Sequence, residues 1–373
     1  MAHDTDKPMT NVTNAYESLF SDDIALIDVR APIEFVNGSF PSAVNLPILS
    51  DEERHDVGLI YKTKGPQAAR HYGFKTVSGS IKHERVDAWC NFIQQHERTA
   101  LYCFRGGMRS EIACTWLEEA GYKTQKVNGG YKALRQFLLN TLELQHHDLL
   151  VIAGKTGTGK THLLHKLKGG IDLEGAADHR GSAFGGHIRE QPAQIDFENS
   201  IAVALVKAKQ QGLDTVYMED EGRLIGRIRL PQTLQSKLQS APLILLEASL
   251  EERVERIFDE YIIEQWQEYQ DWFNEVAFEA FANYLLTAID AIRKRLGSAL
   301  HKQLRGDLER ALCQQQRGEF DAHKIWIEGL LRHYYDPMYN YQINKKGDRI
   351  VYRGNHQEIL DWLNKTRSTQ SAP

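Results

Sequence analysis

Two stretches of this 373-residue chain combine residue types and spacings that favour chemistry. The first fits the pattern G-x-x-x-x-G-K-[ST] at every fixed position, with Gly154, Lys155, Thr156, Gly157, Thr158, Gly159, Lys160 and Thr161. Its glycines let backbone N–H groups turn toward an anion, Lys160 supplies a cation, and Thr161 supplies a hydroxyl ligand for Mg²⁺. The pattern therefore predicts a binding site for a di- or triphosphate group.

The second stretch is a cysteine loop, in which Cys103 ends an apolar run and two glycines lead into a helical pattern. Loop amides, the helix dipole and the nearby Arg105 and Arg109 would favour a thiolate at Cys103. Such a thiolate is a nucleophile and a carrier of sulfur or selenium. The spacing of Cys103 and Arg109 is also that of cysteine phosphatases, which is the competing interpretation. Buried structural positions are predicted for the other cysteines, Cys90, Cys114 and Cys313.

Three acids, Glu219, Asp220 and Glu221, directly follow an apolar run at 215–218. They stand where a strand would end near the phosphate loop, so any one of these carboxylates is a candidate ligand for Mg²⁺. Acids that end a strand at the protein surface are the alternative interpretation. No structural metal site is predicted.

Strand-sized apolar runs alternate with helical patterns along the chain, and these elements must position the two loops. The runs that predict strands are 24–28, 100–103, 149–153, 215–218 and 243–247. Such alternation favours an α/β fold with mainly parallel sheets. Each loop follows one of the runs and precedes a helical pattern, so each site is predicted where a strand ends.

The same pattern predicts how the chain divides into domains. We predict one domain over residues 13–140, a linker over 141–148 and a P-loop NTPase-like domain over 149–250. Residues 251–335 have a helical pattern with little Gly or Pro, which predicts a helical extension. Residues 336–366 are predicted to return to the P-loop domain as a strand, a turn, a second strand and a helix.

Composition excludes several classes of protein. Hydrophobic residues make up 42% and charged residues 25%, unlike a disordered chain. No apolar run reaches the roughly 18 residues of a membrane helix, so no membrane partner is expected. The four cysteines lack regular spacing, which favours a reducing, cytoplasmic setting.

The net charge of −5 means that any nucleic acid must bind a local basic patch. Acids dominate residues 251–279, whereas bases dominate residues 290–310, with Arg293, Lys294, Arg295, Lys302, Arg305 and Arg310. Two interpretations fit this pattern: a basic helix that binds a polyanion, or a helix face that is exposed to solvent.

Further motifs resemble a rhodanese domain. Residues 28–35 read Asp-Val-Arg-Ala-Pro-Ile-Glu-Phe, residues 38–47 continue the motif, and the cysteine loop and Asn-Gly-Gly-Tyr at 128–131 complete it. A rhodanese domain joined to a P-loop domain is similar to the bacterial tRNA 2-selenouridine synthase family. Segments 172–185, 191–198 and 333–337 also resemble that family. The resemblance covers residues 13–365.

The resemblance implies a transferase that acts on wobble 2-thiouridine in the anticodon loop of tRNA. It implies that selenium from selenophosphate replaces sulfur, by way of an S-geranyl intermediate made with geranyl diphosphate. Cys103, Arg105 and Arg109 would serve the selenation step, and the phosphate loop would hold the diphosphate. His179, Arg180 and Ser182 would join Asp220 and Glu219 in contacting Mg²⁺ or substrate, and Phe184 is a candidate for stacking on the flipped base. A transient selenophosphate-producing partner is implied, but no tightly bound cofactor.

Two other functions fit the motifs. One is a P-loop kinase or ATPase with a cysteine-phosphatase-like domain. The other is a sulfur carrier that hands a persulfide to a partner enzyme. The selenium transferase is preferred because it accounts for both loops and for the segment 172–185 together.

Overall fold

The computed structural model describes residues 16–144 and 147–370, which form two compact units. Unit 1 consists of residues 1–145 and 193–212, and unit 2 consists of residues 146–192 and 213–373. The main sheet of each unit is parallel, which confirms the predicted α/β fold class. Residues 13–15 and 145–146 of the predicted boundaries lie outside the described residues. No helix in the described part of the chain has both the length and the apolar character to cross a membrane.

In its described residues, unit 1 contains a four-stranded sheet in the order β2-β1-β3-β4. The strands are β1 (Ala25–Asp28), β2 (Ala43–Asn45), β3 (Thr99–Tyr102) and β4 (Gln125–Lys126). The helices are α2 (Pro32–Val36), α3 (Asp51–Thr76), α4 (Gly79–Gln94), α5 (Met108–Glu119), α6 (Gly130–Leu144) and α9 (Gln194–Gln210). Strand β1 is buried along its whole length, which explains why its sequence reads as a continuous apolar run.

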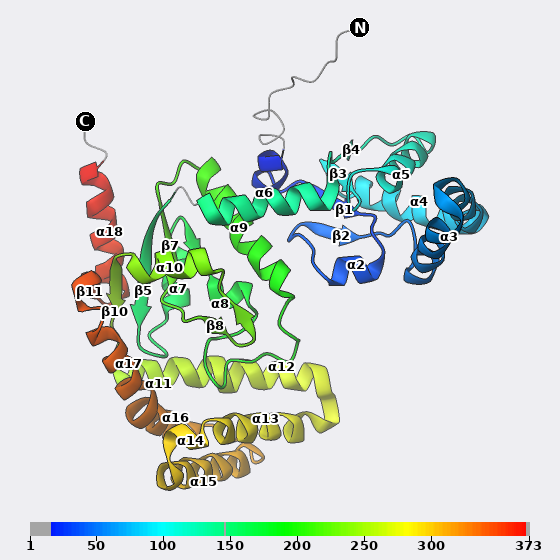
Figure 1. The fold of residues 1–373 in the computed structure, drawn as a ribbon. Helices are drawn as coiled ribbons and strands as arrows, with labels where there is room; N and C mark the ends of the chain where they lie inside the picture. Colours follow the sequence, from blue (N-terminus) through cyan, green and yellow to red (C-terminus); the bar gives the residue numbers. More distant parts are fainter. Residues whose placement is uncertain (1–15, 145–146, 371–373) are drawn as a thin grey trace. The chain divides into compact units, whose positions relative to one another are not determined.

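Helix α9 lies in the middle of the P-loop region in sequence but packs within unit 1. Its side chains Phe197 and Ile201 are fully buried, and the helix lies along α6 (Figure 1). Arg135 of α6 donates to Asn199 Oδ1 at 2.7 Å. Unit 2 therefore differs from the predicted P-loop domain of residues 149–250, because the apolar face of α9 is covered by unit 1.

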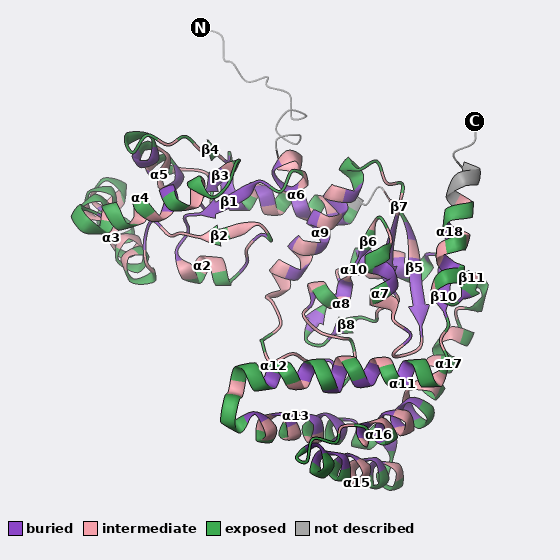
Figure 2. Ribbon diagram, turned by 180° about the vertical axis from the view of Figure 1, so that it is seen from behind, coloured by how far each residue is buried: buried purple, intermediate pink, exposed green. Residues whose placement is uncertain are grey.

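Unit 2 contains, among the described residues, a five-stranded parallel sheet in the order β11-β10-β5-β7-β6. The strands are β5 (Asp148–Gly154), β6 (Gly170–Ile171), β7 (Thr215–Glu219), β10 (Leu243–Leu246) and β11 (Ile350–Gly354), with a separate hairpin of β8 (Leu224–Ile225) and β9 (Ile228–Arg229). The helices next to these strands are α7 (Lys160–Lys166), α8 (Leu173–Ala176), α10 (Gln232–Ser240) and α18 (His356–Gln370). Figure 2 shows β5 as a mostly buried strand, which suits a central position in the sheet.

A layer of helices follows β10 in the chain. Its elements are α11 (Leu250–Phe258), η1 (Asp259–Ile263), α12 (Glu264–Phe273), η2 (Asn274–Val276), α13 (Ala277–Ala291), α14 (Arg293–Leu296), α15 (Ser298–Gln315), α16 (His323–Leu330) and η3 (Leu331–Tyr335). The layer has its own apolar core, in which Phe281, Leu285 and Trp326 are buried. Both η1 and η3 are π-helical turns, a conformation that often marks functional sites.

The C-terminal segment differs from the predicted strand, turn and strand. It forms α17 (Asp336–Asn344), then η4 (Gly347–Arg349), and one strand, β11, in the described residues. Pro337 is the second residue of α17, and α17 follows the π-helical turn η3 directly, so the helical segment that begins before Pro337 continues past it. Strand β11 pairs with β10, and α18 buries Ile359 and Leu363 in the core of this sheet.

Candidate active site

The phosphate loop joins β5 to α7 and takes up a backbone that only glycine adopts easily. Gly157 and Gly159 have φ angles of +81° and +82°. A Cβ on Gly157 would lie 2.8 Å from Ile257 Cγ1, and a Cβ on Gly159 would lie 3.0 Å from the Arg256 guanidinium. Glycine is therefore required here both for conformation and for space.

Two arginines of α11 hold the loop in place. Arg253 Nε donates to Thr156 O at 2.9 Å, and Arg256 donates to Gly157 O. Arg253 is only 2% exposed, and its two Nη groups donate to the carboxylate oxygens of Asp336 at 2.6 and 2.9 Å. The basic residues after β10 thus position the phosphate loop, and Asp336 of α17 positions one of them.

The loop opens into a polar cavity of about 520 Å³ within unit 2, which we call the phosphate cavity. Lys160 and Thr161 line it, and Lys160 Nζ lies 3.4 Å from Gly154 O. The phosphate cavity is also lined by four of the predicted contact residues, His179, Arg180, Ser182 and Asp220. The fold therefore brings these four residues together with the phosphate loop.

The acids at the end of β7 are engaged by partners within the protein. Glu219 is fully buried and accepts a hydrogen bond from Leu173 N at 2.9 Å. Burial raises the pKa of Glu219 well above its usual range, which favours the neutral acid. Asp220 lines the phosphate cavity and forms an ion pair with Lys346 at 2.6 Å. Thr161, at the start of α7, keeps the position that the motif assigns to a ligand of Mg²⁺.

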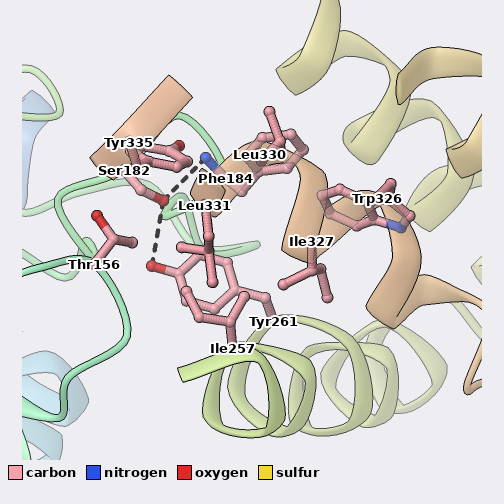
Figure 3. A pocket seen from close by; sticks show the side chains of 10 residues that line it. All are labelled: Thr156, Ser182, Phe184, Ile257, Tyr261, Trp326, Ile327, Leu330, Leu331 and Tyr335. Atoms are coloured by element: carbon pink, nitrogen blue, oxygen red, sulfur yellow. Dashed lines mark hydrogen bonds between the residues drawn. The ribbon is translucent and has the colours of Figure 1, made fainter. Parts of the chain in front are cut away.

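A small apolar pocket adjoins the phosphate cavity (Figure 3). Its volume is about 20 Å³, and its apolar walls include Ile327, Leu330 and Leu331. Five residues line both the pocket and the phosphate cavity: Thr156, Ser182, Ile257, Tyr261 and Tyr335. Ser182 Oγ donates to Tyr261 Oη at 3.2 Å between the two spaces. An apolar recess and an anion site thus share a wall.

Phe184 is part of the core of the helical layer. It is 3% exposed, and the centre of its ring lies 5.2 Å from that of Trp326. Tyr284 also donates to Phe184 O. The structure contradicts the prediction that this ring stacks on a tRNA base, because the ring is buried in the core of the helical layer.

In unit 1, the cysteine loop runs from β3 into α5 and leaves Cys103 only 3% exposed. Its Sγ lies 3.3 Å from Ser110 Oγ and 3.8 Å from Gly107 O. Burial acts to raise the pKa of this thiol, but hydrogen bonds from Ser110 and the loop backbone, together with the charge of Arg109, outweigh burial and lower the pKa. The loop therefore favours the thiolate form of Cys103.

The two arginines of this loop have different surroundings. Arg109 Nη1 forms an ion pair with Glu34 Oε2 at 2.6 Å, and Arg54 Nε lies 3.2 Å from the same oxygen. Arg105 is exposed, and its guanidinium lies 6.0 Å from the centre of the Phe104 ring. Arg109 therefore ties the start of α5 to α2, whereas Arg105 stands at the surface of the loop.

The other cysteines divide into two kinds. Cys90 is buried and Cys114 is half-buried, and in both cases burial raises the pKa of the thiol. Cys313 is exposed on α15, so the prediction that it is buried is wrong. Helix α15 buries Leu308 and Leu312, and the next position along the helix turns away from that face.

Sequence reasoning did not assign several residues that shape these sites. Glu34 and Asp336 lie in segments that resemble known families, but their partners Arg109 and Arg253 are 75 and 83 positions away. Lys346, which binds Asp220, lies at 344–347, where the sequence predicts a turn and no functional contact. These pairs become visible only when the fold is known.

The two sites define a class of protein, a rhodanese-like domain fused to a P-loop domain. Comparison with known proteins agrees with this class: the Rhodanese-like domain family matches residues 11–136, and the tRNA 2-selenouridine synthase AAA domain family matches residues 147–370. The chain belongs to the tRNA 2-selenouridine synthase family.

Relatives with that name match nearly the whole chain. The tRNA 2-selenouridine synthase of Marinobacter nauticus is 46% identical over 96% of this chain and 98% of the relative. Those of Pseudomonas fluorescens and Bordetella petrii are each 47% identical, over 93% and 94% of this chain and 96% and 95% of the relatives. The family resemblance noted in the sequence is therefore confirmed.

Proposed function

We propose that this chain replaces the sulfur of wobble 2-thiouridine in tRNA by selenium from selenophosphate, by way of an S-geranyl intermediate made with geranyl diphosphate. The observation that carries the proposal is the phosphate cavity, in which an anion cradle adjoins an apolar pocket. The names of the relatives support tRNA selenouridine modification. Selenophosphate and geranyl diphosphate as substrates are part of our proposal.

An isoprenoid diphosphate has a polyanionic end and an apolar end, and the two adjoining spaces match that division. The phosphate loop amides, Lys160 and Arg180 would receive the diphosphate. The geranyl chain would enter the apolar pocket beyond Tyr261 and Ile257. Because the pocket has a volume of only about 20 Å³, the chain must displace side chains, and the π-helical turns η1 and η3 supply two of the walls that would move.

The cysteine loop suits the second step. Cys103 has a lowered pKa and lies where a helix begins, which favours a nucleophile that can carry selenium from selenophosphate. Arg105 is the exposed cation nearest to it in sequence and would attract an anionic donor. In this proposal, Arg109 acts through Glu34 by holding the loop.

The tRNA would contact exposed basic side chains of the helical layer. Arg293, Lys294 and Lys302 are exposed, whereas Arg305 and Arg310 pair with acids on their own helix. The first three are therefore the better candidates for phosphate contacts from the basic segment. Affinity for tRNA would then fall as salt rises, since each phosphate contact releases counterions.

The test is mass spectrometry of wobble nucleosides after the pure protein is incubated with thiolated tRNA, geranyl diphosphate and selenophosphate. Lys160→Ala should abolish geranylation yet still convert tRNA that already carries S-geranyl-2-thiouridine. Cys103→Ala should give the opposite result and accumulate the geranylated nucleoside. Lys166→Ala on the exposed end of α7 and Cys114→Ala in α5 are the matched controls.

Several results would refute the proposal. If the wild-type protein forms no geranylated nucleoside, or Lys160→Ala geranylates at the wild-type rate, the assignment of the phosphate loop fails. If Cys103→Ala completes selenation at the wild-type rate, the assignment of the cysteine loop fails.

A further inference from the structure

Helix α3 of unit 1 is exposed along most of its length. It is broken at Gly65, whose φ of +84° is not helical, so it consists of two arms, 51–64 and 66–76. Tyr72 of the second arm donates to Asp56 Oδ2 of the first arm at 3.1 Å, so the arms lie against each other with Gly65 at the tip. We call this pair of arms the α3 hairpin. Figure 2 shows it as mostly exposed, and Ala69 is the one buried residue of α3, which the structure describes throughout.

The α3 hairpin carries positive charge in a protein whose net charge is −5. Residues 57–83 contain no Asp or Glu, but they include five bases: Lys62, Lys64, Arg70, Lys75 and Lys82. Lys82 lies beyond α3 and pairs with Glu119 at 2.9 Å. Within the described residues, none of the other four bases forms an ion pair. The hairpin therefore presents cations that no contact within the protein accounts for.

The acids of the α3 hairpin stand away from its tip. All four lie in the first two turns of the first arm: Asp51, Glu52, Glu53 and Asp56. The last of them is roughly 13 Å from Gly65 along the helix axis. An exposed helix usually interleaves both signs of charge, as α15 does where Arg305 and Arg310 pair with acids of the same helix. The single sign at the tip leaves a local positive potential that faces solvent.

Aromatic rings stand among these bases. Tyr61 is 59% exposed, and within the described residues its hydroxyl has no hydrogen-bond partner and its ring contacts no other ring or cation. Phe74 of the second arm is 40% exposed, and the guanidinium of Arg70 lies 5.6 Å from the centre of its ring. Surfaces that bind unpaired RNA combine the same two features, because rings stack on bases while Lys and Arg contact phosphates.

We propose that the tip of the α3 hairpin binds the phosphate backbone and an unpaired base of tRNA. This inference rests on the proposed function, because it takes tRNA as the substrate, and it adds a contact surface on unit 1. Lys62, Lys64 and Arg70 contact phosphates, and Tyr61 stacks on the base. A helix that lies on a membrane needs a continuous apolar face, whereas the exposed Leu59 and Tyr61 are followed directly by Lys62. The charge and the rings together therefore fit RNA better than a lipid surface.

The test is equilibrium binding of thiolated tRNA to the full-length protein over a range of salt concentrations, without the other two substrates. Lys62→Gln combined with Lys64→Gln should reduce the slope of log affinity against log salt by about 1.4–1.8, and weaken binding about 20-fold near physiological salt. Tyr61→Ala should weaken binding about 10-fold at an unchanged slope, because a stacked ring releases no counterions.

Conservative variants and one distant lysine are the controls. Lys62→Arg combined with Lys64→Arg keeps both charges, and Tyr61→Phe keeps the ring, so each should bind tRNA as the wild type does. Lys123→Gln removes a charge from an exposed position of unit 1 outside α3, and it should leave the slope unchanged. Far-UV circular dichroism equal to that of the wild type shows that each variant is still folded.

The outcomes separate this inference from the proposed function. If the wild type binds tRNA, and the double Gln variant and Tyr61→Ala bind within about 2-fold of it at the same slope, the inference is overturned and the proposed function stands. A change of slope in Lys123→Gln as large as in the double variant also overturns it, since net charge would then explain the effect. Unchanged tRNA affinity with lost binding to vesicles rich in phosphatidylserine overturns it in favour of a membrane surface. Absence of tRNA binding by the wild-type protein overturns both.

Discussion

Replacement of Asp336 by asparagine should destabilise unit 2 and loosen the phosphate loop. The carboxylate of Asp336 accepts two hydrogen bonds from the guanidinium of Arg253, at 2.6 and 2.9 Å, and Lys155 Nζ lies 3.4 Å away. Arg253 is 2% exposed and donates in turn to Thr156 O. Without the carboxylate, a buried cation loses its counter-charge while it still holds the loop.

The expected cost follows from the burial of the two partners. Removal of one partner from a fully buried ion pair costs about 3–5 kcal/mol. The side chain of Asp336 is 18% exposed, and asparagine keeps one oxygen acceptor, so solvent and the remaining hydrogen bond reduce the loss. We therefore expect the free energy of unfolding to fall by about 2–3 kcal/mol.

The difference between wild type and variant should also depend on pH. Burial acts to raise the pKa of Asp336, but hydrogen bonds and charge from Arg253, with the charge of Lys155, outweigh burial and lower it. A carboxyl group with a lowered pKa stabilises the fold above its unfolded pKa and ceases to do so as pH falls through its folded pKa. The difference should thus be constant near neutral pH and shrink below about pH 4.

The assay is urea unfolding of the two proteins at several pH values, together with hydrogen exchange of the peptide over residues 152–164. The variant should unfold at lower urea and exchange faster in the phosphate loop. Asp361→Asn is the control, since Asp361 is exposed on α18 and binds only Gln357 of the same helix in the described structure. Equal shifts in both variants, or a difference that does not change in acid, would refute this account of the loop.

Two further predictions concern unit 1. Ser110→Ala should raise the pKa of Cys103 and slow its alkylation at neutral pH, because Ser110 Oγ lies 3.3 Å from Sγ and stabilises the thiolate. The rate of iodoacetamide labelling against pH checks this, and an unchanged profile would show that the hydroxyl of Ser110 does not contribute to the lowered pKa. A fragment of residues 1–145 lacks α9 and should expose the face of α6 that packs against α9. Phe197 and Ile201 of α9 are fully buried, and the burial of each side chain contributes about 1.5–3 kcal/mol. We expect a hydrophobic dye to bind this fragment. It should not bind a second fragment in which residues 193–212 are joined to residues 1–145 by a flexible linker. Equal dye binding by the two fragments would contradict the prediction.

The two loops were predictable because each has strong local determinants. The phosphate loop depends on positive φ angles at Gly157 and Gly159, and glycine at these positions is visible in the sequence. The strands before the loops, β3 and β5, are mostly buried, so continuous apolar runs identify them. Such features depend on neighbours in sequence, which is why the α/β fold and the place of each loop could be predicted.

Other features depend on partners far away in the chain. The sequence of α9 shows a helix with apolar side chains, but not which unit covers them. The sequence at 336–344 predicts a strand, whereas the structure continues η3 into the helix α17 there. Burial and the charge of Glu174, which is remote in sequence, raise the pKa of Glu221 to about 8. Tertiary packing decides all three, and a single sequence carries no direct record of it.

The way the chain passes between its two units bears on how two chemical steps could be linked. The chain crosses from one unit to the other after residues 145, 192 and 212, so three peptide connections join them. The segment with His179, Arg180 and Ser182 lines the phosphate cavity and continues directly into α9, which Arg135 fastens within unit 1. If the first step occurs at Lys160 and the second at Cys103, the geranylated tRNA must meet both units in turn. For tRNA that stays bound to unit 2, covalent connection would present the second site at an effective concentration on the order of millimolar.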